Sequence, residues 1–341
     1  MMRQQVADLI EAEAGEIIFT SGGTEADNLA ILGVAAARRK KGNHIITSSI
    51  EHPAVLNSCK QLAKSGFDVT FLPVDQYGLV DPEELCKAIR SETILISIMH
   101  ANNEIGTIEP IEEFSRIAKE HGVLFHTDAD RKSTRLNFNV NTLGVDLLTL
   151  SSHKIYGPKG VGALYKRKGV RLQPVVYGGG QESNSRSGTE NTVGIVGFGK
   201  AAEIAARDLD SEFNRTRELR DKLIQGIKER IPDVKYNGHP ERRLPHNVNF
   251  SFSYVEGESM LLSLDMKGIA ASSGSACSSS SLKPSHVLKA IGLPYELIHG
   301  SLRMTLGRIN DAADIDYVLE ILPEVITRLR SFSPLANKLT V

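Results

Sequence analysis

The feature that most constrains the fold is an alternation, over roughly the first 200 residues, of short apolar runs with longer amphipathic segments. This alternation is typical of parallel strands that are linked by helices. The apolar runs predict strands at Glu16–Thr20, His44–Ser48, Val69–Leu72, Thr93–Met99, Val123–Thr127, Leu147–Leu150 and Gly162–Tyr165. Two of the linking segments, Thr24–Lys41 and Ile111–His121, have the apolar spacing of helices. We therefore expect an α/β domain with a mostly parallel sheet flanked by helices.

The pattern changes near Asp210, where a long charged segment replaces the alternation. We predict a helix over Ser211–Arg230 and a final helix over Ala312–Phe332. Between them the sequence predicts strands and one helix, at Asn247–Phe252, Glu258–Met266 (the helix), Gly268–Ala271 and Leu302–Thr305. The chain is thus expected to have a large domain over 1–210 and a smaller C-terminal α+β domain over 211–341.

The composition excludes several classes of function. The chain has 40 Lys and Arg against 41 Asp and Glu, a net charge of −1, so we expect neither nucleic acid nor a membrane surface as a partner. Its three cysteines, Cys59, Cys86 and Cys277, fit neither a disulfide framework nor a zinc site. No metal site is therefore predicted, and a reducing, cytoplasmic location is expected. No apolar run reaches membrane-spanning length.

Polar residues follow several of the predicted strands, at the edge where a parallel α/β sheet binds its ligands. His52 follows the second strand, Asn103 follows the fourth, and Asp128 ends the fifth. Lys154 follows the sixth strand, directly after His153 and shortly before a Gly-Pro turn. Taken singly, a histidine or an aspartate at such a place is usually structural, and a lysine usually lies at the surface. Their collection at one edge indicates a binding site.

A glycine turn follows the first strand and opens the predicted helix at Gly23 and Thr24. The N–H groups at the start of a helix suit a phosphate, although a plain helix cap by Thr24 explains the same residues equally well. The turn lacks both the Walker lysine and the dinucleotide fingerprint, which argues against a dinucleotide-binding oxidoreductase. Together the strand ends offer an amine, a carboxylate, an imidazole, hydroxyls and a helix start, which is the set that pyridoxal phosphate requires.

At this point the sequence resembles a known family, the fold-type I enzymes related to class V aminotransferases, and among them the cysteine desulfurases that supply sulfur for iron–sulfur cluster assembly. The resemblance runs from about Val6 to the last helix. The matching motifs are SGGTEADN at Ser21–Asn28, HANNEIGTIEP at His100–Pro110, HTDA at His126–Ala129, SSHKIYGPKG at Ser151–Gly160, RSGTEN at Arg186–Asn191 and ASSGSACSSSSLKPSHVL at Ala271–Leu288.

The resemblance implies roles for the residues around the cofactor ring. Lys154 is expected to carry pyridoxal phosphate as a Schiff base and to take the α proton of the substrate. Asp128 is expected to pair with the pyridine nitrogen. His52 is expected to stack on the ring and to act as a catalytic acid or base.

The resemblance also implies phosphate and substrate contacts. The phosphate is expected to bind Gly23, Thr24, Ser151 and His153. Thr189 is expected to reach the phosphate of the neighbouring subunit, because the site of this family lies at a homodimer interface. Asn103 is expected to contact the cofactor hydroxyl and the substrate. Arg303 is expected to hold the carboxylate of the substrate as a bidentate fork.

Cys277 lies in a stretch of Ser and Gly, 272–281, that is too small and polar to be buried. We therefore expect its thiol on a mobile, exposed loop, whereas Cys59 and Cys86 lie on predicted helices and are expected to be small core residues. The resemblance implies that L-cysteine is converted to L-alanine and that a persulfide forms on Cys277. The sulfur would then pass to an iron–sulfur scaffold or another acceptor protein.

Two features differ from the family pattern. The family has a glutamine three residues after the aspartate of HTDA, in contact with the cofactor, and here that position is Arg131, within the charged run 130–137. The family also begins with a further N-terminal segment, and we expect this chain to start after it. The alternatives to a desulfurase are a selenocysteine lyase, a class V aminotransferase, or a catalytically impaired partner protein that keeps the fold.

Overall fold

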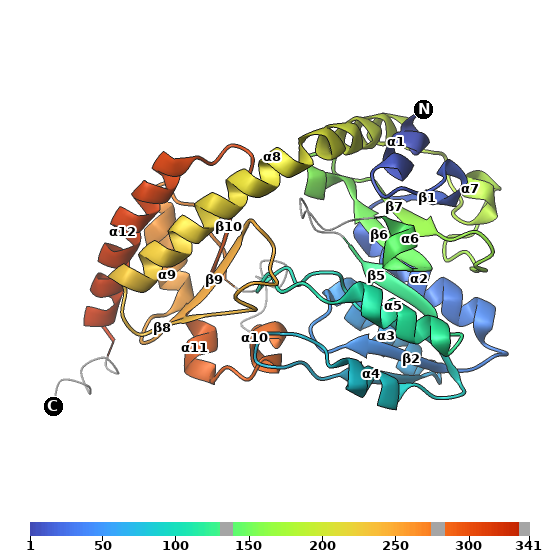
Figure 1. The fold of residues 1–341 in the computed structure, drawn as a ribbon, viewed down its shortest axis with the longest axis horizontal. Coiled ribbons are helices and arrows are strands. Elements are labelled where there is room, and N and C mark those ends of the chain that lie inside the picture. The colour runs from blue at the N-terminus through green and yellow to red at the C-terminus, as the bar shows by residue number, and fades with distance from the viewer. Residues whose placement is uncertain (130–138, 274–283, 334–341) are drawn as a thin grey trace. The chain divides into compact units, whose positions relative to one another are not determined.

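The computed structural model describes residues 1–129, 139–273 and 284–333 (Figure 1). The contacts divide the chain into two compact units. Unit 1 comprises 1–73, 80–101 and 109–209, and unit 2 comprises 74–79, 102–108 and the chain from Asp210 onward. The candidate site residues Arg131 and Cys277 lie outside the described residues.

The sheet of unit 1 has seven strands in the order β1-β7-β6-β5-β4-β2-β3 (Figure 1). They are β1 (Ile17–Thr20), β2 (His44–Ser48), β3 (Asp68–Leu72), β4 (Thr93–Ser97), β5 (Leu124–Asp128), β6 (Leu147–Ser151) and β7 (Gly162–Lys166). The predicted strands are confirmed, with shifts of one or two residues at seven of the fourteen strand ends. The pairs β3–β2, β2–β4, β4–β5 and β5–β6 are parallel. Strand β7 runs antiparallel to both of its neighbours, β6 and β1. The sheet is therefore mostly, not wholly, parallel.

The helices of unit 1 follow the strands in the expected way. They are α1 (Met2–Asp8), α2 (Gly23–Arg38), α3 (Pro53–Lys64), α4 (Pro82–Ala88), α5 (Ile111–Glu120), α6 (Val140–Leu143), α7 (Gln181–Asn184) and the first part of α8 (Thr192–Arg230). Helix α2 packs against β4, β5, β6 and β7. Its side chains Leu29, Ile31 and Val34 join the strand residues Leu95 and Leu124 in one buried cluster. This packing fixes the start of α2 near the carboxyl edge of β5 and β6.

Unit 2 contains a second, antiparallel sheet in the order β10-β9-β8. Its elements are β8 (Val234–Tyr236), β9 (Asn247–Phe252), α9 (Gly257–Asp265), α10 (His286–Ala290), α11 (Tyr295–His299), β10 (Ser301–Thr305) and α12 (Ala312–Ser331). Two predictions for the second half of the chain were wrong. Helix α8 begins at Thr192 rather than at Ser211. The segment Gly268–Ala271 is not a strand, because only the following residue, Ser272, pairs with a strand, at Arg303.

A short segment of the first half of the chain, 102–108, is held within unit 2 by a buried arginine. The guanidinium of Arg243 donates hydrogen bonds to the carbonyl oxygens of Ile105 (3.0 Å), Asn237 (3.2 Å), His239 (3.1 Å) and Asn247 (3.2 Å). Burial lowers the pKa of Arg243 to about 10, so the group keeps its charge at neutral pH. The segment that carries Asn103 is thus fastened to β9 and to the residues before it.

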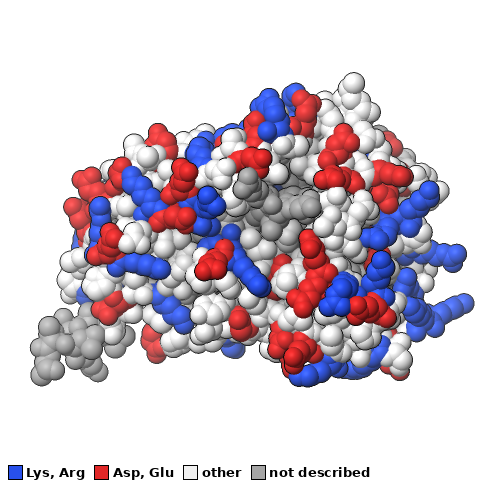
Figure 2. Space-filling view, viewed as in Figure 1, with Lys and Arg blue, Asp and Glu red and all other residues white. Residues whose placement is uncertain are grey.

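On the face that Figure 2 draws, basic and acidic side chains are interspersed. This distribution agrees with the net charge of −1. Among the helices that the structure describes, none combines the length and the apolar character needed to cross a membrane.

The cysteine predictions have mixed outcomes. Cys59, on α3, is buried as expected, and burial raises the pKa of its thiol to about 12. The prediction for Cys86 was wrong, because this residue is exposed. Helix α4 is short and buries only Leu85, so the neighbouring Cys86 points away from the core.

Candidate active site

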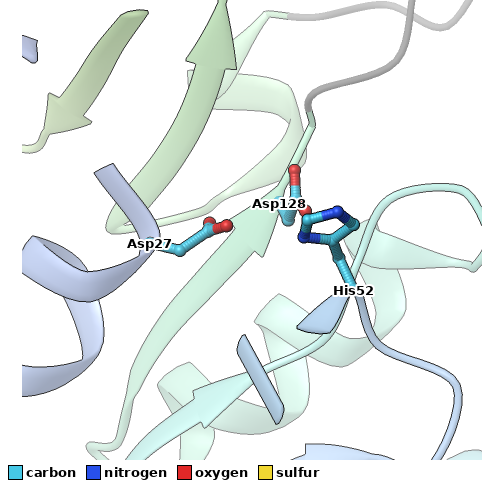
Figure 3. A group of neighbouring side chains, drawn as sticks. All are labelled: Asp27, His52 and Asp128. Carbon is cyan, nitrogen blue, oxygen red and sulfur yellow. The ribbon is translucent and has the colours of Figure 1, made fainter. Parts of the chain in front are cut away.

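Three polar side chains from three elements meet at the carboxyl edge of the unit 1 sheet (Figure 3). Asp128 is the last residue of β5, His52 caps the start of α3, and Asp27 lies on α2. One side-chain atom from each lies within 4.8 Å of the other two. The Nδ1 atom of His52 accepts a hydrogen bond from the backbone N–H of Ala54, at 3.2 Å. The neutral ring therefore carries its proton on Nε2.

His126 lies two residues before Asp128, on the same face of β5. Its Nδ1 lies 2.8 Å from the Ser97 hydroxyl and its Nε2 lies 3.1 Å from the Thr149 hydroxyl. The same Nε2 lies 3.7 Å from a carboxylate oxygen of Asp27. Burial lowers the pKa of His126 to about 4, so the ring is neutral at neutral pH.

Glu51 is fully buried beside this group and precedes His52 in the chain. Its Oε1 accepts hydrogen bonds from the Ser48 hydroxyl (2.7 Å) and from the backbone N–H of Met99 (2.8 Å). Burial raises the pKa of Glu51 to about 8, with a further contribution from the charge of Asp128. Glu51 is therefore mostly protonated and uncharged at neutral pH.

Lys154 follows the strand that pairs with the strand of Asp128. It belongs to a short 3₁₀ helix, Ser152–Ile155, that directly follows β6, the neighbour of β5. Its side chain is half-buried. Beside it, the hydroxyl of Ser151 and the Nδ1 of His153 are hydrogen-bonded at 2.8 Å. The predicted amine and its two polar neighbours thus lie at the same sheet edge as Asp128.

The start of α2 forms the third part of the site. The helix begins at Gly23, followed by the exposed Thr24, and the N–H groups of a first helical turn have no partner within the helix. The backbone of Gly22 lies so close to Gly162 of β7 that a Cβ at Gly162 would lie 2.6 Å from it. A larger residue at Gly162 would therefore push the helix start away from the sheet.

The loop that carries Thr189 is tied to this helix start. Arg186 donates two hydrogen bonds to the carboxylate of Glu25 on α2, at 2.7 and 3.1 Å. Before the loop, Glu182 adopts a left-handed conformation, and its carboxylate accepts hydrogen bonds from Arg3 and from the backbone N–H of Phe19. Thr189 itself is exposed.

Asn103 and Arg303 belong to unit 2, where the structure brings them together. Arg303, on β10, donates from Nη1 to the backbone carbonyl of Asn103 at 3.1 Å, and from Nε to the hydroxyl of Ser272 at 3.2 Å. The adjacent Glu104 is buried and accepts a hydrogen bond from the hydroxyl of Ser285.

Sequence reasoning gave no role to Asp27 or to Glu51, although both lie beside Asp128. A signal for Asp27 was present, because this aspartate shares the buried face of α2 with Ala30, Ile31 and Val34. A charged residue on an apolar helix face is usually buried for a reason. No comparable signal marked Glu51, whose burial follows from the packing of β2, α3 and β4.

The donors of unit 1 fit pyridoxal phosphate. A buried carboxylate, Asp128, suits the ring nitrogen, and the half-buried amine of Lys154 suits the aldehyde carbon. The helix start at Gly23 and the hydrogen-bonded pair Ser151 and His153 suit a phosphate. The close approach of Gly162 to Gly22 holds the helix start beside this edge of the sheet.

Comparison with known proteins gives consistent results. The model of the aminotransferase class-V family matches residues 1–318. The cysteine desulfurase IscS of Dictyoglomus turgidum is 58% identical over 332 residues, which is 97% of this chain and 84% of that protein. A solved NifS-like protein has a TM-score of 0.89 and 38% identity, covering 96% of this chain and 87% of its own. The structure of SspA in complex with cysteine has a TM-score of 0.77 and 39% identity, covering 89% and 85%.

Proposed function

The chain belongs to the aminotransferase class-V family, and on that premise we propose that it is a pyridoxal phosphate-dependent cysteine desulfurase. The sequence prediction of an α/β, fold-type I transferase fold is confirmed by the sheet and by the solved relatives. The observation that carries the proposal is the position of Asp128, His52 and Lys154 on strand ends of one sheet edge. The relatives named as cysteine desulfurases, at 55 to 58% identity, favour this activity over that of a selenocysteine lyase or an aminotransferase.

In this proposal the residues of unit 1 bind the cofactor. Asp128 would hold the ring nitrogen and His52 would lie against the ring. The first turn of α2, with Gly23 and Thr24, and the side chains of Ser151 and His153 would hold the phosphate. When bound, pyridoxal phosphate supplies an electron sink for the carbanion that forms at the α carbon of the substrate.

The remaining steps use the residues of this chain. Lys154 would bind the cofactor through its Nζ before the substrate arrives and, once the substrate amine has taken its place, the freed amine would move the α proton of the substrate. Arg303 binds the carboxylate of the substrate through its guanidinium, and Asn103, held to Arg303, contacts the bound groups. His52 holds a proton on Nε2, because Nδ1 accepts from Ala54, and donates it to the carbon that loses sulfur.

The sulfur step is a transfer to Cys277. The thiolate of Cys277 attacks the sulfur of the substrate, a new S–S bond forms, and the bond between that sulfur and the β carbon breaks. The electron pair of the broken bond goes to carbon, which takes up a proton and becomes the methyl group of alanine. Sulfur is oxidised and carbon is reduced in equal measure, so L-cysteine and one thiol give L-alanine and one persulfide.

We further propose that the protein is a cytoplasmic homodimer that passes this sulfur to an iron–sulfur scaffold or another acceptor protein. In the dimer, Thr189 of one subunit contacts the phosphate of the other. The exposure of Thr189 supports this arrangement, because the side chain is accessible to a second subunit. The contact of Arg131 with the cofactor hydroxyl is part of the same proposal.

The test is a measurement of alanine released from L-cysteine by the protein loaded with pyridoxal phosphate. We expect one alanine for each sulfur released in the presence of a thiol reductant, and loss of both products in Lys154→Ala and Cys277→Ser. The matched control, Cys86→Ser, changes an exposed thiol and is expected to keep the activity. Alanine formation that survives in Lys154→Ala, or transamination of a keto acid in place of sulfur release, would disprove the proposal.

A further inference from the structure

Strand β9 of unit 2 has an apolar face and a polar face, and both are buried. The apolar face joins the core of unit 2. The polar face consists of three residues, each at most 2% exposed: Asn247, Asn249 and Ser251. An antiparallel sheet commonly turns its polar face to water. Because buried polar side chains need hydrogen-bond partners, the partners of this face show what it holds in place.

The polar face packs against the segment 102–108, which also belongs to unit 2. The side-chain amide of Asn249 donates a hydrogen bond to the carbonyl oxygen of Glu104 at 2.9 Å, and that of Asn247 donates to the same oxygen at 3.2 Å. The Oδ1 atom of Asn249 accepts from the amide of Asn237 at 2.8 Å. Since a carbonyl oxygen can only accept, these two contacts fix the orientation of the Asn249 amide.

Arg303 is the cross-strand neighbour of Asn249. The two residues lie directly opposite each other in the pair of β9 and β10, so their side chains share one face of the sheet. Arg303 donates to the carbonyl oxygen of Asn103, the residue before Glu104, at 3.1 Å. Two adjacent side chains of the sheet thus hold two successive carbonyl groups of one segment. A displacement of the Glu104 carbonyl therefore shifts the Asn103 carbonyl, which orients the guanidinium.

The next carbonyl of the segment is held as well. Arg243 donates to the carbonyl oxygen of Ile105 at 3.0 Å. The Glu104 carbonyl thus lies between two that are bound by arginines, and its own donors are the amides of β9. Of these two amides, that of Asn249 makes the shorter bond and lies opposite Arg303.

We propose that Asn249 is a positioning residue for the carboxylate of the substrate, and that it acts on the guanidinium of Arg303 through the carbonyl groups of Glu104 and Asn103. This inference rests on the proposed function, which assigns Arg303 to that carboxylate. A bidentate pair of guanidinium and carboxylate depends on direction as well as on charge. A misplacement of about 1 Å can cost an enzyme about a hundredfold in rate.

The first test compares two ligands of the protein loaded with pyridoxal phosphate. These are L-alanine and L-alaninamide, which has no carboxylate, and their binding is followed by the change in visible absorbance of the cofactor. The variant Asn249→Leu removes the donor to Glu104 with little change in size and adds no charge beside Arg303. We expect it to weaken the binding of L-alanine about tenfold and that of L-alaninamide less than twofold.

The matched control is Ser251→Ala. It removes an equally buried polar group of the same strand face, one that accepts from Asn237 at 2.9 Å rather than donating to the segment 102–108. Both affinities are expected to change less than twofold in this variant. A selective loss of L-alanine binding in Ser251→Ala would assign the effect to the buried network as a whole and overturn the role of Asn249.

The second test asks whether Asn249 acts through Arg303. Asn249→Leu is combined with Arg303→Ala, and the affinity for L-alanine is compared with that of Arg303→Ala alone. If the two residues act in series, the tenfold effect of Asn249→Leu falls to less than twofold when Arg303 is absent. A tenfold effect that persists in the Arg303→Ala background overturns the inference.

The remaining outcomes separate this inference from the proposed function. An equal loss for both ligands in Asn249→Leu, or an unchanged affinity for both, overturns the role of Asn249 while Arg303→Ala still weakens L-alanine. If Asn249→Leu does not fold, as judged by its thermal unfolding, the same measurements are made on Asn249→Ser. A wild-type protein that binds no cofactor, or whose cofactor absorbance does not respond to L-alanine, overturns both.

Discussion

Glu51→Gln is expected to change how the stability of the protein depends on pH. In the folded protein the carboxyl of Glu51 is buried and has a pKa of about 8, whereas the ordinary value is 4.5. Between these values the folded protein holds a proton that the unfolded chain has released. Stability from this group is therefore fully present below pH 4.5 and is lost as the pH rises toward 8, at about 1.4 kcal/mol per pH unit.

Glutamine does not titrate in this pH range. Its amide oxygen can still accept the hydrogen bonds that the Ser48 hydroxyl and the Met99 backbone N–H donate to Glu51. The free energy of unfolding of Glu51→Gln, relative to the wild type, is thus expected to increase by about 3 to 4 kcal/mol between pH 5 and pH 8. His126 and His100 change stability in the opposite direction below pH 6.5, because burial lowers the pKa of each to about 4. They are present in both proteins, so their contribution cancels in the difference.

The assay is urea unfolding of the two apoproteins at pH 5, 6, 7 and 8, followed by circular dichroism. Glu258→Gln, which changes an exposed glutamate at the start of α9, serves as the control and is expected to give a difference that does not vary with pH. A difference for Glu51→Gln that is equally constant from pH 5 to pH 8 would refute the reasoning, because Glu51 would then ionise as an ordinary surface carboxylate does.

Two further predictions concern the packing of unit 1. Gly162→Ala is expected to weaken pyridoxal phosphate binding about tenfold, because the new Cβ displaces Gly22 at the helix start, and to lower stability by about 1 to 3 kcal/mol; unchanged cofactor titration would contradict this. In a Cys277→Ser background, a thiol reagent is expected to label Cys86 rapidly and Cys59 only after unfolding, since burial raises the pKa of Cys59 to about 12. Rapid labelling of two thiols per chain would contradict the burial of Cys59.

Most strands of unit 1 were predictable because they are short, buried and largely apolar runs, although in β3 only Leu72 is buried. His44–Ser48, for example, is buried at all five positions and its bounds were predicted without error. The antiparallel direction of β7 could not be predicted in the same way. The composition of β7 is like that of the parallel strands, and only its pairing differs. The local sequence thus predicts whether a strand is buried better than it predicts which strand it pairs with.

The errors at Gly268–Ala271 and at the start of α8 have the same origin. Gly268–Ala271 is apolar enough for a strand, but the partner backbone of β10 reaches only Ser272. The start of α8 was missed because its first turns contain Gly194, Gly197 and Gly199, which weaken the helical pattern. These glycines have a packing reason, since a Cβ at Gly197 would overlap Pro158. Tertiary packing, which the local sequence does not display, decided both cases.

The candidate site shows how far motif reasoning extends. It identified reactive residues such as Lys154 and Asp128, because a polar residue at the end of an apolar strand is easily recognised in the sequence. It missed Asp27 and Glu51, which are buried beside Asp128. Burial raises the pKa of Glu51 to about 8 and lowers that of His126 to about 4, and a motif does not display either effect.

Each unit fixes its own part of the proposed chemistry through contacts within that unit. In unit 1, Arg186 and Glu25 hold the Thr189 loop against the start of α2, which is proposed to bind the phosphate. In unit 2, Arg303 is bonded to the Asn103 backbone, and Arg243 holds the segment that carries Asn103. The guanidinium proposed to bind the substrate is therefore oriented, within unit 2, by hydrogen bonds to the backbone of Asn103 and to the hydroxyl of Ser272. Because Asn103 is also proposed to contact the cofactor hydroxyl, its segment links recognition of the substrate carboxylate to the position of the cofactor.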